Sequence, residues 1–343
     1  MMQSHVLLIY TGGTIGMNRN PHTKALEPFD FEHLLYNVPE LKQFDTKIST
    51  YQFAPPIDSS DMSPQLWVKL AHVIADNYDT YDGFVVLHGT DTMAYTASAL
   101  SYVLENLNKP VIFTGSQLPI GQLRTDGKEN LITSIEIAAA RNREGRAMVP
   151  EVGIYFNGHL LRGNRTTKQS ADEFNAFESF NYPHLVDAGV NITYHHDLIF
   201  KPDFTKPMTP HFGFDNNVVI FSLFPGIRED LVRYIISTPN LRSIVMRTFG
   251  SGNAPRSPWL INALKDATRH GMVVVNISQC MEGKVEMGRY DTGYQLKEAG
   301  VVSGYDSTVE SAVTKLRFLQ SKYDDQELVR KYMQQSIRGE ITI

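Results

Sequence analysis

The stretch HVLLIYTGGTIGM, residues 5–17, joins a continuous apolar run to a glycine pair that stands between two threonines. The apolar run at 6–10 is typical of a strand covered on both faces, as in a parallel sheet. A glycine pair directly after a strand indicates a sharp turn or a backbone that another group approaches closely. Two interpretations follow: a tight strand-to-helix turn with a threonine cap, or a site built around the hydroxyls of Thr11 and Thr14.

The rest of the first half alternates between strands and helices. Further strands are expected at 83–88, 111–114 and 152–156. Apolar residues recur at helical spacing over 93–107 and again over 131–138, and "NLNKP" is expected to end the first of these helices. This alternation is typical of an α/β domain with a parallel sheet.

The alternation breaks and then restarts. The stretch from about 187 to 217 has several prolines and no sustained period, so it is interpreted as a hairpin followed by a linker. Strands are expected again within "VVIFSLFPG", "SIVMRTFGSGN" and "MVVVNIS". Ser307 with Glu310 forms a capping box that predicts a helix to about Leu319, and Asp324 with Glu327 predicts a last helix.

These patterns predict two α/β domains. The larger N-terminal domain is expected to have a mainly parallel sheet, and the smaller C-terminal domain to be Rossmann-like. The expected division is 1–190 for the first domain, 191–215 for the linker and 216–343 for the second. A chain of 343 residues fits two domains, because one core seldom grows past ~250–300 residues.

Composition excludes several classes of protein. The net charge of −5 and the pI of about 6.1 leave no basic surplus for nucleic acid or for an anionic membrane. The single cysteine, Cys280, rules out a disulfide within the chain and favours a reducing compartment. The N-terminal apolar run lacks a basic leader and is too short for a signal peptide, and no apolar stretch reaches the length of a membrane span. We expect a cytoplasmic protein.

Hydroxyl groups gather at the ends of three expected strands. The sequences are TGGT at 11–14, HGTDT at 88–92 and TGSQ at 114–117. In open α/β sheets, sites lie beyond the carboxyl ends of strands, so these loops are expected to meet in one crevice. In the plainer alternative, Thr90, Asp91 and Thr92 cap the helix that follows.

Two further loops carry polar groups of the same kind. In "PPIDSSDMSPQLW", Ser63 is expected to cap a helix that has proline at its first position, which leaves Asp58, Ser59, Ser60 and Asp61 unexplained. In "LLRGNRTTKQSADEF", Lys168 follows two threonines; a solvated lysine is the alternative.

The usual cofactor and hydrolase motifs are missing. The sequence has no G-x-G-x-x-G after the first strand, no G-x-x-x-x-G-K-[ST] and no G-x-S-x-G. The run His195-His196-Asp197 lacks the H-E-x-x-H spacing, so it is interpreted as structural or surface, and no metal or other cofactor is expected. The remaining groups suit acyl transfer, in which a lysine of lowered pKa takes a proton from threonine. A neighbouring aspartate would orient that lysine but also favour its charged form.

At this point the motifs resemble a known family, the bacterial L-asparaginases. The resemblance runs in order through "TGGTIGM", "DSSDM", "LHGTDTM", "TGSQ", "RGNRTTK", "SGNAP", "NISQCMEGKV" and "STVESAVTKL", and it favours the cytoplasmic, type I branch. It implies an amidohydrolase that converts asparagine to aspartate and ammonia through a covalent acyl-enzyme. Thr14 is then the expected nucleophile, and Thr90, Asp91 and Lys168 form a second triad.

The resemblance also implies how the substrate binds. Ser59 and Ser60 match the loop that holds the α-carboxylate and α-amine, and Asp91 is expected to meet the α-ammonium. Ser116 matches the position whose backbone carbonyl faces the side-chain amide. The family usually has a tyrosine on the loop after TGGT, but "NRNPHTKALEPFDF" has none, so Tyr290 is the expected substitute.

Assembly and regulation follow from the same resemblance. It implies a homodimer or homotetramer, and an allosteric site for a second asparagine at Arg247, Asn253 and Cys280. A simple buried position is the alternative for Cys280. Two other functions stay open: a glutaminase-asparaginase of mixed specificity and a catalytically silent amino-acid sensor.

Overall fold

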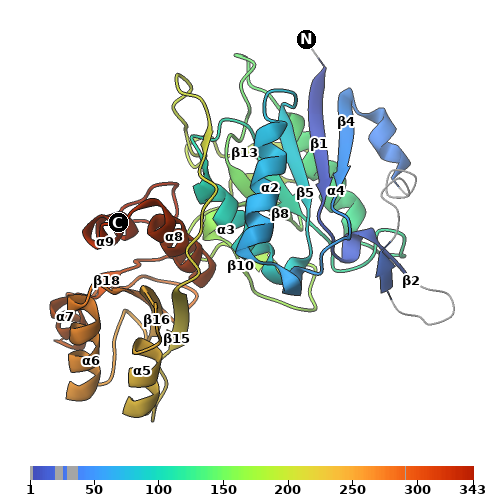
Figure 1. Cartoon of the computed structure of the whole chain (residues 1–343). Helices are drawn as coiled ribbons and strands as arrows, with labels where there is room; N and C mark the ends of the chain where they lie inside the picture. Colours follow the sequence, from blue (N-terminus) through green and yellow to red (C-terminus); the bar gives the residue numbers. More distant parts are fainter. Residues whose placement is uncertain (1–2, 20–25, 29–37, 290) are drawn as a thin grey trace. The chain divides into compact units, whose positions relative to one another are not determined.

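The computed structural model describes residues 3–19, 26–28, 38–289 and 291–343 (Figure 1). It contains two compact units, Met1–Phe212 and Gly213–Ile343. Within the described ranges, every helix is too short or too polar to cross a bilayer.

The N-terminal unit is built on an eight-stranded sheet of order β13-β12-β9-β8-β7-β5-β1-β4. Five neighbouring strands are parallel: β4 (Thr46–Gln52), β1 (Ser4–Tyr10), β5 (Gly83–Leu87), β7 (Val111–Thr114) and β8 (Val152–Phe156). Three antiparallel strands extend it: β9 (His159–Arg162), β12 (Val186–Ala188) and β13 (Ile192–Tyr194). The chain reverses its strand order around β1, which is the kind of position where α/β proteins place their sites.

Helices cover both faces of this sheet. Helices α2 (Pro64–Asp76) and α3 (Met93–Val103) lie in front of it in Figure 1, and α4 (Gly127–Ala139) lies behind. Leu131 and Ile135 of α4 share a core cluster with Val6 and Leu8 of β1. Successive residues of a strand point to opposite sides of the sheet. Because the central strands are continuously apolar, both faces of the sheet are apolar. Short strand pairs complete the unit: β2 (Met17–Arg19) with β3 (Leu26–Pro28), β6 (Leu104–Glu105) with β14 (Thr209–Pro210), and β10 (Thr167–Lys168) with β11 (Phe177–Glu178).

The prediction of a helix reaching 107 is wrong at its end. Helix α3 stops at Val103, because Leu104 and Glu105 leave the helical path to pair with β14. Asn106 then turns the chain with a φ of 56°. The cap at Ser63 is confirmed, since its side chain accepts a hydrogen bond from the Leu66 amide at the start of α2.

The C-terminal unit has a four-stranded parallel sheet of order β15-β16-β17-β18. Its strands are β15 (Val218–Ser222), β16 (Ser243–Thr248), β17 (Val273–Ser278) and β18 (Val302–Ser303). Its helices are α5 (Glu229–Ile236), α6 (Pro258–Arg269), α7 (Asp291–Glu298), α8 (Val309–Lys322) and α9 (Gln326–Met333). The predicted fold class, two α/β parts with the larger mainly parallel sheet first, is confirmed.

Two predicted helix caps in this unit are wrong by one residue. Thr308, not Ser307, accepts from the Ser311 amide at the start of α8. Asp325, not Asp324, accepts from the Glu327 amide at the start of α9.

A buried ion pair ties the last residues of the C-terminal unit to α8. Lys315 Nζ lies 2.5 Å from Glu340 Oε1, and the two side chains are 1% and 0% exposed. The Glu340 carboxylate also accepts from the amides of Ile337 and Arg338, and Lys315 donates to the Gln335 carbonyl. Such extra hydrogen bonds are what a buried pair needs to offset the loss of hydration.

Candidate active site

The glycine pair of the opening motif brings the end of β1 against the neighbouring strand-end loop. Gly13 has φ 96° and ψ 170°, a conformation that is essentially restricted to glycine. A Cβ at Gly13 would lie 2.6 Å from both Cα and N of Gly89. The short helical turn Thr14–Gly16 has no side-chain cap, so the interpretation as a threonine-capped turn is wrong. Glycine is required at position 13 because the backbone of Gly89 lies too close to leave room for a side chain.

The loop after β5 does not serve as a helix cap either. Thr92 stands at the N-cap position of α3, yet no side chain caps that helix. Its hydroxyl donates instead to the Ser59 carbonyl at 2.7 Å. A Cβ at Gly89 would meet Ser59 Oγ at 2.5 Å, so the segments around Gly13, Ser59 and Gly89 fit directly against one another.

Lys168 reaches this loop from β10. Its Nζ donates to Thr90 Oγ1 at 2.8 Å and to Asp91 Oδ1 at 2.7 Å. The lysine side chain is 18% exposed, whereas that of Asp91 is 65% exposed. The structure therefore joins the expected members of the second triad, although Lys168 is 78 residues from Thr90 in sequence. A lysine nitrogen in contact with a hydroxyl is the arrangement that can move a proton to or from it.

His88 supports the loop from the buried side, a role that is not predicted from the sequence. It is 1% exposed, with Nδ1 2.7 Å from the Gly89 carbonyl and Nε2 3.0 Å from Thr96 Oγ1, which also accepts from Trp67 Nε1. Burial lowers the pKa of His88 to about 4, although the hydrogen bond to Gly89 acts in the opposite direction. The imidazole is therefore neutral at physiological pH. An imidazole at the end of an otherwise apolar strand was the available signal.

The expected substrate-binding serines differ in their surroundings. Ser59 is 5% exposed beneath Gly89, whereas Ser60 is exposed and its hydroxyl donates to Asp58 at 2.9 Å. Ser116 is buried, and its hydroxyl donates to the Leu118 carbonyl at 2.6 Å. That hydroxyl is thus occupied, which leaves the backbone of Ser116 as the part that can face a ligand.

Asp126 fixes the third strand-end loop. Its carboxylate accepts from the amides of Gln117 and Leu118 and from Asn130 Nδ2. Burial raises the pKa of Asp126, and these hydrogen bonds act against that rise. The Gln117 side chain in turn donates to the carbonyls of Ala171 and Glu173, in the segment that follows Lys168. Gln117 therefore connects the loop after β7 to the segment that follows β10.

The remaining predicted site residues lie outside the described residues or in the C-terminal unit. Tyr290 lies outside the described residues. Arg247 lies on β16, Asn253 lies in the loop after it, and Cys280 follows β17, all in the C-terminal unit. Asn253 accepts from the Thr292 hydroxyl at 3.0 Å, and the buried Nε of Arg247 has no hydrogen-bond partner among the described residues. The alternative of a buried Cys280 is wrong, because this thiol is free and exposed.

Comparisons with known proteins agree along the whole chain. The family model for asparaginase, N-terminal, matches residues 5–200, and that for the glutaminase/asparaginase C-terminal domain matches 217–333. L-asparaginase 1 of Escherichia coli (strain K12) is 43% identical over 350 residues, covering 100% of this chain and 99% of that protein. L-asparaginase I from Vibrio cholerae O1 biovar eltor has a similar structure, with 41% identity, a TM-score of 0.90 and 100% of both chains covered. The thermostable L-asparaginase from Thermococcus kodakarensis has 31% identity and a TM-score of 0.89 over 99% of each chain.

Proposed function

The chain belongs to the asparaginase family, and on that premise we propose that it is an L-asparagine amidohydrolase that forms L-aspartate and ammonia. The contact of Lys168 Nζ with both Thr90 Oγ1 and Asp91 Oδ1 carries the proposal. A binding protein needs to hold an amino acid, but it has no use for a lysine that contacts a threonine hydroxyl. The same contact argues against a catalytically silent sensor.

Thr14 is the proposed nucleophile. Its hydroxyl oxygen attacks the side-chain amide carbon of asparagine, and the C–N bond breaks, so that an acyl-enzyme remains. The proton that the hydroxyl gives up balances the one that the leaving NH2 group takes up to become ammonia. Tyr290 is the proposed partner of Thr14, in place of the tyrosine expected on the loop after TGGT. Backbone contact between Gly13 and Gly89 supports this role for Thr14, because it brings the start of the nucleophile turn against the Thr90 loop.

Thr90, Lys168 and Asp91 are proposed to manage the proton transfers. Lys168 accepts a proton from the Thr90 hydroxyl, and Thr90 accepts one from the water that hydrolyses the acyl-enzyme. Asp91 orients the lysine, and its exposed oxygen is free to bind the α-ammonium of the substrate. Ser59, Ser60 and the backbone of Ser116 complete the proposed substrate contacts.

Assembly, location and regulation are proposed on the same premise. We propose a homodimer or homotetramer in the cytoplasm, where an exposed free thiol such as Cys280 stays reduced. A second asparagine is proposed to act as an allosteric activator at Arg247, Asn253 and Cys280. The division into 1–190, a linker at 191–215 and 216–343 stays a prediction.

Ammonia release from asparagine and from glutamine, measured over a wide concentration range, tests the activity. Wild type should release ammonia from asparagine, Thr14→Ala should lose this activity, and Thr14→Ser should keep part of it because a hydroxyl remains. A sigmoidal asparagine curve that becomes hyperbolic in Arg247→Ala would support the activator site.

Three outcomes would contradict parts of the proposal. Comparable turnover of glutamine would indicate mixed specificity, since one methylene changes binding by only ~1–3 kcal/mol. Binding without ammonia release, in a protein folded by circular dichroism, would indicate a sensor. Full activity of Thr14→Ala would reject the nucleophile.

A further inference from the structure

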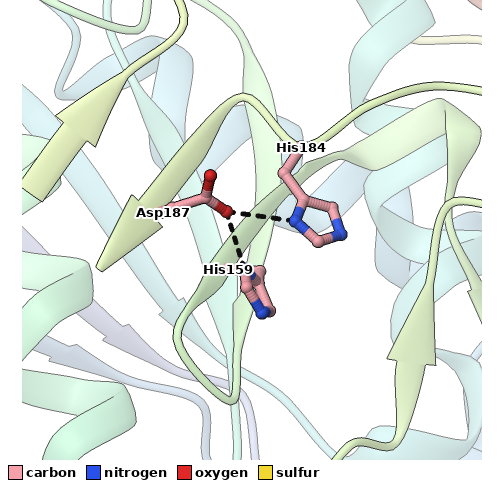
Figure 2. Close-up of side chains that lie close together, drawn as sticks. All are labelled: His159, His184 and Asp187. Atoms are coloured by element: carbon pink, nitrogen blue, oxygen red, sulfur yellow. Dashed lines mark hydrogen bonds and ion pairs between the residues drawn. The ribbon is translucent and has the colours of Figure 1, made fainter. Parts of the chain in front are cut away.

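A cluster of histidines surrounds one carboxylate at the antiparallel end of the N-terminal sheet, among residues to which the proposed function assigns no role. His159 on β9 and His184, just before β12, both donate from Nδ1 to Oδ1 of Asp187, at 2.8 and 3.1 Å. Figure 2 shows the two imidazoles converging on this one oxygen. One ligand atom from each of these residues lies within 4.8 Å of the others.

We propose that His159, His184 and Asp187 bind a divalent transition-metal cation of the zinc class. Imidazole nitrogen and carboxylate oxygen are ligands that such ions accept. Around zinc, tetrahedral ligands at 2.0–2.2 Å lie ~3.3 Å apart. The distances from Asp187 Oδ1 to the two imidazole nitrogens, 2.8 and 3.1 Å, are close to this spacing, and the ion would take the place of the two hydrogen-bonded protons.

The carboxylate is already prepared to act as an anionic ligand. His195 Nε2 donates to the other oxygen of Asp187 at 2.7 Å. Partial burial acts to raise the pKa of Asp187, but the hydrogen bonds from His195, His159 and His184 outweigh it and lower the pKa to about 2. With His195 on Oδ2, Oδ1 is the oxygen directed at the other two histidines.

A second carboxylate orients one of the ligating rings. Glu178 Oε1 lies 3.5 Å from Nε2 of His184, and it also accepts from the Ser179 amide at 2.9 Å. Metal-binding histidines commonly direct their second ring nitrogen at such a carboxylate, which fixes the tautomer. The cluster thus has an outer layer, Glu178 and His195, as well as three ligand atoms.

Solvent and further ligands can reach the cluster. The side chains of His159, His184 and Asp187 are 41%, 30% and 44% exposed. Beside them lies a hollow of about 660 Å³, lined by Tyr182 and Leu198 among others. A water molecule can therefore fill the fourth coordination position. An ion bound here would cross-link β9, β12 and the turn before β12.

The cluster also lies next to the strand pair that carries Lys168. Glu178 belongs to β11, and its register partner on β10 is Thr167, the neighbour of Lys168. This site cannot be predicted from the sequence, because its residues follow no metal-binding spacing, and the run His195-His196-Asp197 is interpreted there as structural or surface. In the structure only His195 of that run joins the cluster, while the ring of His196 stacks with Tyr194.

The test is isothermal titration of the full chain, prepared without a histidine tag and stripped with a chelator, with Zn²⁺. Wild type should bind one ion per chain, and His159→Ala and His184→Ala should weaken that binding at least tenfold. Glu178→Gln, which alters only the outer layer, should weaken it by about 10–100-fold. His196→Ala is the matched control and should bind like wild type.

A second measurement needs no variant: Co²⁺ added to the stripped wild type should give the visible absorption of a four-coordinate site, which Zn²⁺ should displace. Absence of saturable binding to wild type would overturn the proposal. So would binding that survives in the double variant His159→Ala/His184→Ala, or that is lost in His196→Ala. None of these measurements depends on amide hydrolysis.

Discussion

Gly13→Ala is the substitution that most directly tests why the chain places a glycine pair after β1. The new methyl group would lie 2.6 Å from Cα and N of Gly89, and it would stand at φ 96° and ψ 170°. The backbone strain of that conformation costs about 1–3 kcal/mol for a non-glycine residue. Overpacking against an atom that cannot rotate away adds about 1–3 kcal/mol.

Gly145→Ala separates the two contributions. Gly145 has a φ of +76° and nothing within 4 Å of its hypothetical Cβ, so only the backbone cost of about 1–2 kcal/mol applies there. Both substitutions reduce the freedom of the unfolded chain equally, so that effect cancels in the comparison. Gly13→Ala should therefore be less stable than Gly145→Ala by about 1–4 kcal/mol.

Urea unfolding followed by tryptophan fluorescence measures this difference. The chain has two tryptophans, and in a Trp259→Phe background the buried Trp67 reports on the N-terminal unit alone. Asparagine turnover should also fall about 10²-fold in Gly13→Ala, if the nucleophile turn moves by about 1 Å. Equal stability of the two variants, together with full turnover in Gly13→Ala, would refute the argument from close contact.

Three further predictions follow from polar groups. Lys168→Met should lower kcat by about 10²–10⁴-fold, measured as ammonia release, and unchanged turnover would remove the lysine from the mechanism. Because the pKa of His88 is lowered to about 4, the folded state binds fewer protons than the unfolded state, so wild type should lose up to ~3 kcal/mol as pH falls from 6.5 towards 4; His88→Gln should lack this slope in urea titrations. Lys315→Met should destabilise the C-terminal unit by about 3–5 kcal/mol, seen by Trp259 fluorescence, because it leaves Glu340 buried without its cation; equal stability would contradict that role.

The elements of the fold that could be predicted are those set by local apolar pattern. The strands at 111–114 and 152–156 match β7 and β8, because a strand buried on both faces must be continuously apolar. The end of α3 was missed because it depends on pairing with Thr209–Pro210, about a hundred residues later. The cap at Thr308 was missed because two adjacent hydroxyl residues offer the same local signal.

The candidate site was predictable only in part, for the same reason. Parallel strands place their carboxyl ends at one edge, so the meeting of the loops around Thr14 and Thr90 followed from the fold class. The supporting role of His88 depends on Thr96 and Trp67, which no spacing connects to it. The histidine cluster at Asp187 could not be predicted from the sequence, because its residues come together only when β9 pairs with β12.

The contacts of the strand-end glycines restrict which sequences evolution or a directed library can reach. A Cβ at Gly12 would lie 2.0 Å from the Ile57 carbonyl oxygen, and one at Gly13 would meet the backbone of Gly89. Backbone atoms are the same in every residue, so no second substitution can make room at either position. Gly89 differs, because the two atoms under 3.0 Å from its hypothetical Cβ, Oγ at 2.5 Å and Cβ at 2.7 Å, both belong to the Ser59 side chain. Only glycine at position 59 would remove both atoms and open the space. Neutral substitution is therefore excluded at the first two glycines, whereas at Gly89 a pair of substitutions is sterically possible but removes the Ser59 hydroxyl, which is proposed to contact the substrate.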